Sequence, residues 1–72
     1  MIRDNHVHTV RDVGIGLESA PGAQVINNRI ITENYPNSIE YRFAATTDVV
    51  ITGNQVTGNI ISHDGGRAEV NK

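Results

Sequence analysis

The sequence predicts an all-β protein in which short strands wind about a common axis as a solenoid, and a repeat is the first reason. An asparagine follows an apolar strand at Asn5, Asn28 and Asn54, with spacings of 23 (28 − 5) and 26 (54 − 28) residues. Each has an aliphatic residue three positions before it and another two positions after it, in "IRDNHV", "VINNRI" and "ITGNQV". Repeats of about 20 to 50 residues are typical of solenoids and related arrays.

Alternation between the asparagines is the second reason. The segment "SIEYRF" (38–43) places Ile39, Tyr41 and Phe43 on one side and Glu40 and Arg42 on the other. This period of two is expected for a strand with one buried face. "GIGLES" alternates in the same way, and "NIISHD" is a weaker third copy because two isoleucines are adjacent.

A helical alternative is disfavoured by composition. Residues 46–62 are rich in Thr, Val, Ile, Gly and Asn, which are mediocre or poor helix formers. The chain then ends in "AEVNK" (68–72), which looks like the start of another "AQV" (23–25). We therefore expect three strands per repeat, separated by turns.

The junction at Gly53-Asn54 is either a hairpin turn or a corner of a coil. Hairpins prefer the order Asn-Gly, and here the asparagine is constant while its predecessor changes among Asp4, Asn27 and Gly53. A corner is therefore predicted, at which the recurring asparagine takes the left-handed backbone conformation. Its amide is expected to bond to the same residue one coil above and below, as an asparagine ladder.

Length and composition limit the other possibilities. A chain of 72 residues makes one small domain, which buries only about 60% of its unfolded surface, and it has no cysteine to form a disulfide. The net charge of −2 gives no electrostatic case for nucleic acid or an anionic membrane. No apolar run reaches the ~20 residues of a membrane-spanning helix, and the N-terminus lacks the apolar core of a signal peptide. The chain is thus intracellular or was cut from a precursor, and its localisation stays open.

These motifs resemble the right-handed parallel β-helix family, which includes pectate lyase-like and periplasmic copper-site maturation-type repeat proteins. The family pattern G-I-x-L, a loop and I-x-x-N-x-I is similar to "GIGL" followed by "VINNRI". The resemblance implies a short β-helix of about three coils, roughly residues 1–23, 24–48 and 49–72. It implies an apolar interior made by Ile2, Val7, Ile15, Leu17, Val25, Ile30, Tyr41, Phe43, Ile51 and Val56.

Both ends of such a stub would expose strand edges and apolar cross-section, which are a template for pairing with another chain. No amphipathic helix is evident at either terminus to cap them. The chain is therefore expected to stack or pack with copies of itself as a homo-oligomer, or to be a piece of a longer β-helix.

Four side chains are candidates for ligand binding. Glu40 and Arg42 are expected on the outer face with His63, where an exposed ion pair is the ordinary outcome. Tyr35 lies in "ENYPNS" (33–38), which is expected to protrude, and its ring could stack on a sugar or on another subunit. The glycines of "SHDGGR" (62–67) are most simply explained by a tight turn.

His6 and His8 are weak candidates for metal binding. They are two positions apart in a strand and therefore share its outer face. Their column neighbours would be Arg29 and Gln55 for His6, and Ile31 and Thr57 for His8. None of these is a good metal ligand, so surface histidines are favoured and no metal or other cofactor is expected.

The sequence thus predicts a non-catalytic structural or binding module that self-associates through its coil ends or a lateral face. The alternative is a fragment of a carbohydrate-active β-helix enzyme, such as a polysaccharide lyase or epimerase, or of an adhesin, whose catalytic coils are absent. No catalytic constellation is evident, and fold alone does not determine activity. A polysaccharide remains a candidate partner in this alternative.

Overall fold

The computed structural model describes residues 1–18, 20–42, 48–63 and 67–71, and in these residues the regular structure consists of strands. The strands are β1 Ile2–Arg3, β2 His6–Thr9, β3 Ile15–Glu18, β4 Gln24–Ile26, β5 Arg29–Thr32, β6 Asn37–Arg42, β7 Val49–Thr52, β8 Gln55–Val56, β9 Asn59–His63 and β10 Ala68–Asn71. They are short, as expected from a sequence in which turn residues follow every few aliphatic ones.

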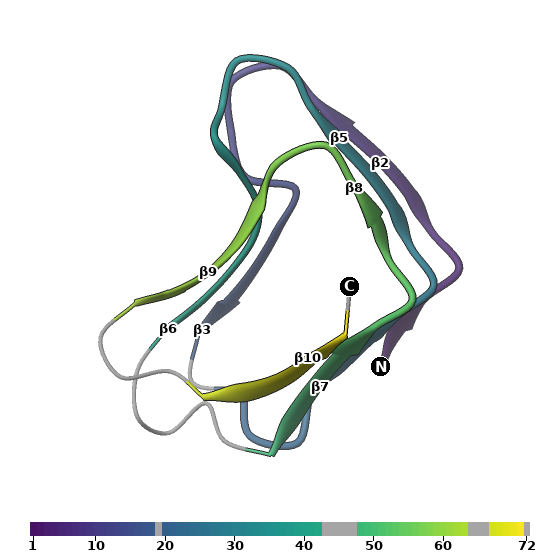
Figure 1. Ribbon diagram of the computed structural model, residues 1–72, viewed down its shortest axis with the longest axis vertical. Helices are drawn as coiled ribbons and strands as arrows, with labels where there is room; N and C mark the ends of the chain where they lie inside the picture. Colours follow the sequence, from purple (N-terminus) through teal and green to yellow (C-terminus); the bar gives the residue numbers. More distant parts are fainter. Residues whose placement is uncertain (19, 43–47, 64–66, 72) are drawn as a thin grey trace.

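The strands form three parallel sheets, and strands that are consecutive in sequence belong to different sheets. The orders are β1-β4-β7-β10, β2-β5-β8 and β3-β6-β9. Figure 1 shows the sheets as three sides around a common interior, and β10 extends the first sheet by a fourth strand. The prediction of an all-β chain is confirmed, and its parallel sheets are compatible with a β-helix.

The register of the sheets follows the sequence repeat. Val25 on β4 pairs with Ile2 on β1 and with Ile51 on β7, the aliphatic residues that precede the three asparagines. Val70 on β10 continues this column beside Ile51. The segment 68–72, which resembles the start of another repeat in sequence, therefore begins in the expected register.

Aliphatic side chains from the three sheets fill the interior. The buried hydrophobic residues are Ile15, Leu17, Val25, Ile30, Ile39, Tyr41, Val49 and Ile51. Ile2, Val7 and Val56 are half-buried against this core, so nine of the ten predicted interior residues lie in or beside it. Phe43, the tenth, lies outside the described residues. Ile39 and Val49, which the resemblance did not imply, also belong to the core.

The left-handed corners lie one residue earlier than predicted. Positive φ angles occur at Asp4 (56°), Asn27 (55°) and Gly53 (70°), the residues that precede the recurring asparagines. Asp, Asn and Gly are the residue types that adopt this conformation at low cost. The changing predecessor therefore makes the corner, which leaves the constant asparagine free to use its side chain.

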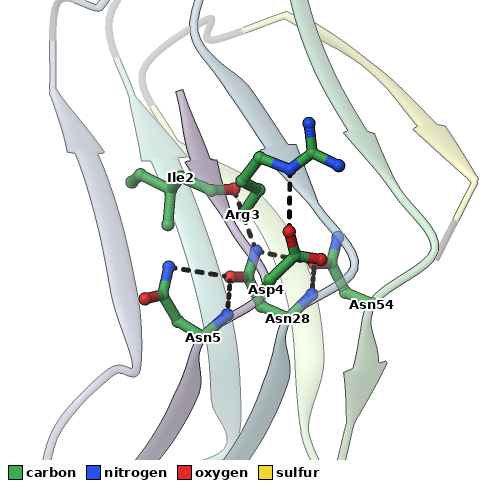
Figure 2. Close-up of polar contacts among 6 residues, drawn as sticks. All are labelled: Ile2, Arg3, Asp4, Asn5, Asn28 and Asn54. Carbon is green, nitrogen blue, oxygen red and sulfur yellow. Dashed lines mark hydrogen bonds and ion pairs between the residues drawn. The ribbon is translucent and has the colours of Figure 1, made fainter.

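The three recurring asparagines are hydrogen-bonded in a row, named here the asparagine row (Asn5, Asn28 and Asn54; Figure 2). The Asn5 side chain donates to Asn28 Oδ1 at 3.1 Å, and the Asn28 side chain donates to Asn54 Oδ1 at 3.0 Å. The same two oxygens also accept the backbone N–H groups of Asn5 and Asn28, at 3.0 and 2.8 Å. Asn28 and Asn54 are buried, so these bonds satisfy polar groups that water does not reach.

The longer second repeat is accommodated partly inside a strand rather than wholly in a loop. Asn37 pairs with Asn59 and Ile39 pairs with Ile60, so Ser38 is an extra residue in β6. Ser38 is fully buried, and its hydroxyl oxygen accepts the backbone N–H of Gly58 at 2.8 Å. The expectation that all of residues 33–38 protrude is therefore wrong, because β6 already begins at Asn37.

Candidate functional site

The polar cluster of greatest interest lies on the outer face of the β3-β6-β9 sheet. Strand β6 turns Ile39 and Tyr41 into the hydrophobic core, and alternation directs Glu40 and Arg42 to the opposite face. Across the sheet, Glu40 pairs with Gly16 and Ile61, and Arg42 pairs with Glu18 and His63. Parallel register thus gathers charged residues that are far apart in sequence.

Glu40 is the centre of this cluster. Its Oε2 accepts hydrogen bonds from the Tyr35 hydroxyl and from Asn37 Nδ2, each at 2.9 Å. Its Oε1 lies 2.7 Å from Arg42 Nη2 in an ion pair. Although it is on the outer face, the Glu40 side chain is only 4% exposed. Both oxygens of a buried carboxylate are therefore satisfied, which offsets the cost of removing the charge from water.

These contacts change the acidity of two groups. The hydrogen bond from Asn37 is the largest influence on Glu40, and with those from Tyr35 and the nearby cations it lowers the pKa of the carboxyl below 4.5, although burial opposes this. The hydrogen bond that Tyr35 donates to Glu40 raises the pKa of the phenol above 10.0. Glu40 is thus held ionised and Tyr35 is held protonated, because each stabilises that form of the other.

His63 completes the cluster from β9. Its Nε2 lies 3.5 Å from Glu40 Oε1, within ion-pair distance if the ring is protonated. This nitrogen is buried and makes no hydrogen bond among the residues that the structure describes. Arg42 and His63 therefore flank the same carboxylate oxygen, and their side chains are 37% and 40% exposed.

A surface pocket of about 220 Å³ lies beside the cluster. The residues that line it include Glu18, Glu40 and Arg42. Gly16 leaves this space open, because a Cβ built there would meet only a Val13 methyl carbon, at 3.8 Å. The pocket offers a guanidinium and an exposed carboxylate to a small polar ligand.

The structure brings together all four predicted binding residues, namely Tyr35, Glu40, Arg42 and His63. Two details differ from expectation. The Glu40–Arg42 ion pair is buried at its carboxylate end, and Tyr35 is half-buried rather than a protruding ring. Both differences arise because the tyrosine hydroxyl reaches Glu40.

Asn37 is the member of the cluster that sequence reasoning missed. It belongs to the segment expected to protrude, and its position three residues before Glu40 is the signal in the sequence that relates the two. The turn predicted at 62–67 lies mostly outside the described residues, which include only its first two positions and Arg67.

The predicted metal candidates are separate from this cluster. His6 and His8 lie on β2 and are exposed, and they pair with Arg29 and Ile31 as the repeat predicts. His8 Nε2 also contacts the Glu33 carboxylate at the surface, which is an ion pair only when the ring is protonated. Within residues 1–18, 20–42, 48–63 and 67–71, no three His, Asp or Glu side chains are grouped so that they could hold a metal ion.

Comparison of the chain with protein-family models, with curated proteins and with solved structures found no significant match. The part of the chain that the structure describes contains no helix long and apolar enough to cross a membrane.

Proposed function

We propose that the chain is a right-handed parallel β-helix of about three coils, with the asparagine row as its ladder. The sheet orders support this, because the chain visits the three sheets in the same sequence on each round. In Figure 1 the chain runs counterclockwise as it approaches the viewer, which is the sense of a right-handed coil. The rounds are β1 to β3, β4 to β6 and β7 to β9, and β10 starts another.

We propose further that this β-helix is a non-catalytic structural or binding module that self-associates through its ends. The observation that carries this proposal is the set of open strand edges. In the described residues, β1, β2 and β3 pair on one side only, and so do β8, β9 and β10 at the other end. Unpaired edges of parallel strands are templates for another chain.

Incomplete burial at the two ends supports the same proposal. The core side chains of the middle round, Val25, Ile30 and Ile39, have no exposed surface. Their column neighbours Val56 and Ile60 at one end remain half-buried, and Val70 is 37% exposed. A neighbouring copy on these ends would remove this apolar surface from water, which is favourable.

The state of Glu40 supports a non-catalytic role. A general acid or base needs an oxygen available to the reacting proton and a pKa near the working pH. Both Glu40 oxygens are engaged, and the pKa of the carboxyl is lowered rather than raised. The cluster is therefore suited to fixing Arg42 and Tyr35 in position.

Molecular mass in solution tests self-association. Light scattering coupled to size exclusion, from about 5 to 200 µM, is expected to give a discrete oligomer without any added ligand. Val56→Lys, which places a charge in one end, is expected to lower the mass. Gln24→Lys, on the outer face of the middle round, is a matched control that leaves it unchanged if the ends associate. A folded wild-type monomer at 200 µM would refute the proposal.

A second candidate function follows from the pocket beside Arg42. A guanidinium at the wall of a pocket recognises carboxylates, as in acidic polysaccharides. The chain would then be part of a carbohydrate-active β-helix protein or an adhesin. Calorimetric titration with an oligogalacturonate tests this candidate. Gly16→Val, which fills the pocket, is expected to abolish binding, and absence of heat with the wild-type chain would reject it.

A further inference from the structure

From the geometry of its two ends, we infer that copies of this chain stack head to tail, with β10 of one copy replacing β1 of the next. This inference rests on the proposed self-association and specifies its orientation. The partner is a second copy of the same chain. Its β2 and β3 would lie on β8 and β9 of the first copy and continue both sheets in the same direction.

The first argument is the direction of the asparagine row. Asn5 and Asn28 each donate their backbone N–H to the Oδ1 of the next asparagine. Asn54 has no such asparagine above it in the described residues. At the other end, Figure 2 shows the Asn5 Oδ1 pointing away from Asn28. Head-to-tail stacking brings this oxygen to the Asn54 end, whereas contact between two like ends would not.

The second argument is the continuity of the side-chain columns. Val7, Ile30 and Val56 form one interior column, and Ile15, Ile39 and Ile60 form another. In a head-to-tail stack, Val7 of the next copy lies on Val56 and its Ile15 lies on Ile60. The half-buried Val7, Val56 and Ile60 are thereby covered by aliphatic residues, whereas Ile15 is already buried within its own chain.

Charge complementarity is the third argument. Glu18, Arg42 and His63 form one column on the outer face. The carboxylate of this column is at one end, and the two basic residues follow it. Stacking places the Glu18 carboxylate of the next copy beside His63, a basic side chain that attracts it when protonated.

Strand β10 explains why one segment must exchange. Val70 and Asn71 pair with Ile51 and Thr52, which is the relation that Val25 and Ile26 have to Ile2 and Arg3. The place that β1 of the next copy would take is therefore already filled. Because β1 has only two residues, it is the strand that leaves. Val70 then takes the position of Ile2 beside Val25 of the next copy.

Disulfide trapping tests the orientation in the full chain, which has no native cysteine. His6 and Gln55 are exposed members of one column with Arg29 between them. Two strand spacings separate them within a chain by about 10 Å, too far for a disulfide, whereas stacked copies bring them to about 4.8 Å. A mixture of ¹⁵N-labelled His6→Cys and unlabelled Gln55→Cys chains is therefore expected to form mixed disulfide dimers under mild oxidation.

The control mixture pairs Arg29→Cys with Gln55→Cys. Between stacked copies this pair is one layer too far apart, so its mixed dimer is expected to be at least tenfold less abundant. Mass spectrometry distinguishes mixed dimers from dimers of one variant. An oligomer in which mixed dimers do not exceed the control, or in which like variants cross-link instead, would overturn head-to-tail stacking and leave self-association standing. A monomeric wild-type chain would remove both.

A matched pair of substitutions tests the exchange. Val70→Asn weakens the strand that must bridge two copies, and it is expected to raise the dissociation constant at least tenfold. Ile2→Asn weakens the strand that must leave, and it is expected to leave the dissociation constant unchanged or to lower it. Sedimentation velocity measures both. An effect of Ile2→Asn as large as that of Val70→Asn would overturn the exchange.

Discussion

Asn28 uses the full hydrogen-bonding capacity of its side chain in the interior of the protein. Its Oδ1 accepts two N–H groups of Asn5, and its Nδ2 donates to Asn54 Oδ1 and to the Ile2 carbonyl oxygen at 3.1 Å. The amide is suited to this role because it carries an acceptor and two donors on one short side chain. Asp in this position would lack the donors.

Replacement of Asn28 should therefore be costly. Asn28→Ala leaves the backbone N–H of Asn5 and the Asn54 oxygen with fewer partners, and a buried polar group without its partner costs about 1–3 kcal/mol. We expect a loss at the upper end of this range in urea-induced unfolding. Asn34→Ala, at an exposed position, is the control and should change the unfolding free energy by less than about 0.5 kcal/mol. Equal effects of the two substitutions would contradict the role assigned to the row.

Glu40 should give the protein a measurable pH dependence. The folded state lowers the pKa of this carboxyl. Its contribution to stability is therefore fully present above about pH 4.5, and it is lost as the pH falls through the lower pKa of the folded state. Glu40→Gln is expected to flatten the acid side of the stability profile, measured by urea unfolding between pH 7 and pH 2.5. The exposed Glu18→Gln should leave that slope unchanged. A Glu40→Gln profile with the same slope as the wild type would rule out this linkage.

Among the elements, the junctions between sheets depend on small residues just before β3 and β9. A Cβ at Gly14 would overlap an Ile30 methyl group and lie 2.9 Å from the Ser38 carbonyl oxygen. A Cβ at Gly58 would lie 2.6 Å from the Pro36 carbonyl oxygen. Both glycines therefore allow one round of the chain to approach the backbone of the next.

Alanine substitutions should separate these two glycines from a third. Gly14→Ala and Gly58→Ala force buried groups apart, and overpacking of this kind costs about 1–3 kcal/mol. Gly16→Ala faces open space and should be neutral or stabilising by about 0.4–1 kcal/mol, since it restricts the unfolded chain. Thermal unfolding of the three variants is the measurement. A tolerated Gly58→Ala would mean that the turn before β9 is looser than the structure indicates.

The elements also show how far sequence reasoning reaches. The strands and their column register could be predicted from the sequence. Side-chain alternation marks each strand, and the spacing of the recurring asparagines indicates which strands lie side by side. The prediction places the left-handed conformation one position too late, at the asparagines. The residues that adopt it, Asp4, Asn27 and Gly53, have different side chains and therefore show no repeated letter in the sequence. The burial of Glu40 could not be predicted, because it accompanies hydrogen bonds from Tyr35 and Asn37 that side-chain alternation does not signal.

For the whole molecule, stability and association should be coupled. A chain of 72 residues has a small core, and several of its apolar columns end in half-buried residues, among them Ile2, Val7, Val56 and Ile60. If copies bind only in the folded state, mass action stabilises that state.

The polar cluster of Tyr35, Glu40, Arg42 and His63 also depends on the whole molecule, because its members come together only when β6 and β9 are in register.

The melting temperature is therefore expected to rise with protein concentration. Differential scanning calorimetry at about 10 and 200 µM should show an increase of several degrees for the wild type. Val56→Lys, placed at one end, should reduce this increase, whereas Gln24→Lys should keep it. A melting temperature independent of concentration would indicate that folding does not depend on the ends.

At the end of the molecule formed by β8, β9 and β10, the extra strand β10 makes a step rather than a flat face. One sheet has four strands and the other two have three, so the end resembles a split washer with one raised third. A flat face would let a neighbour rotate by a third of a turn about the axis around which the three sheets are arranged, and still find strand edges to pair with. The step removes that freedom, because a stepped neighbour fits against the raised strand β10 in only one rotational position. The step at β10 would thus fix the rotational position of the next unit, and not only its distance from this one.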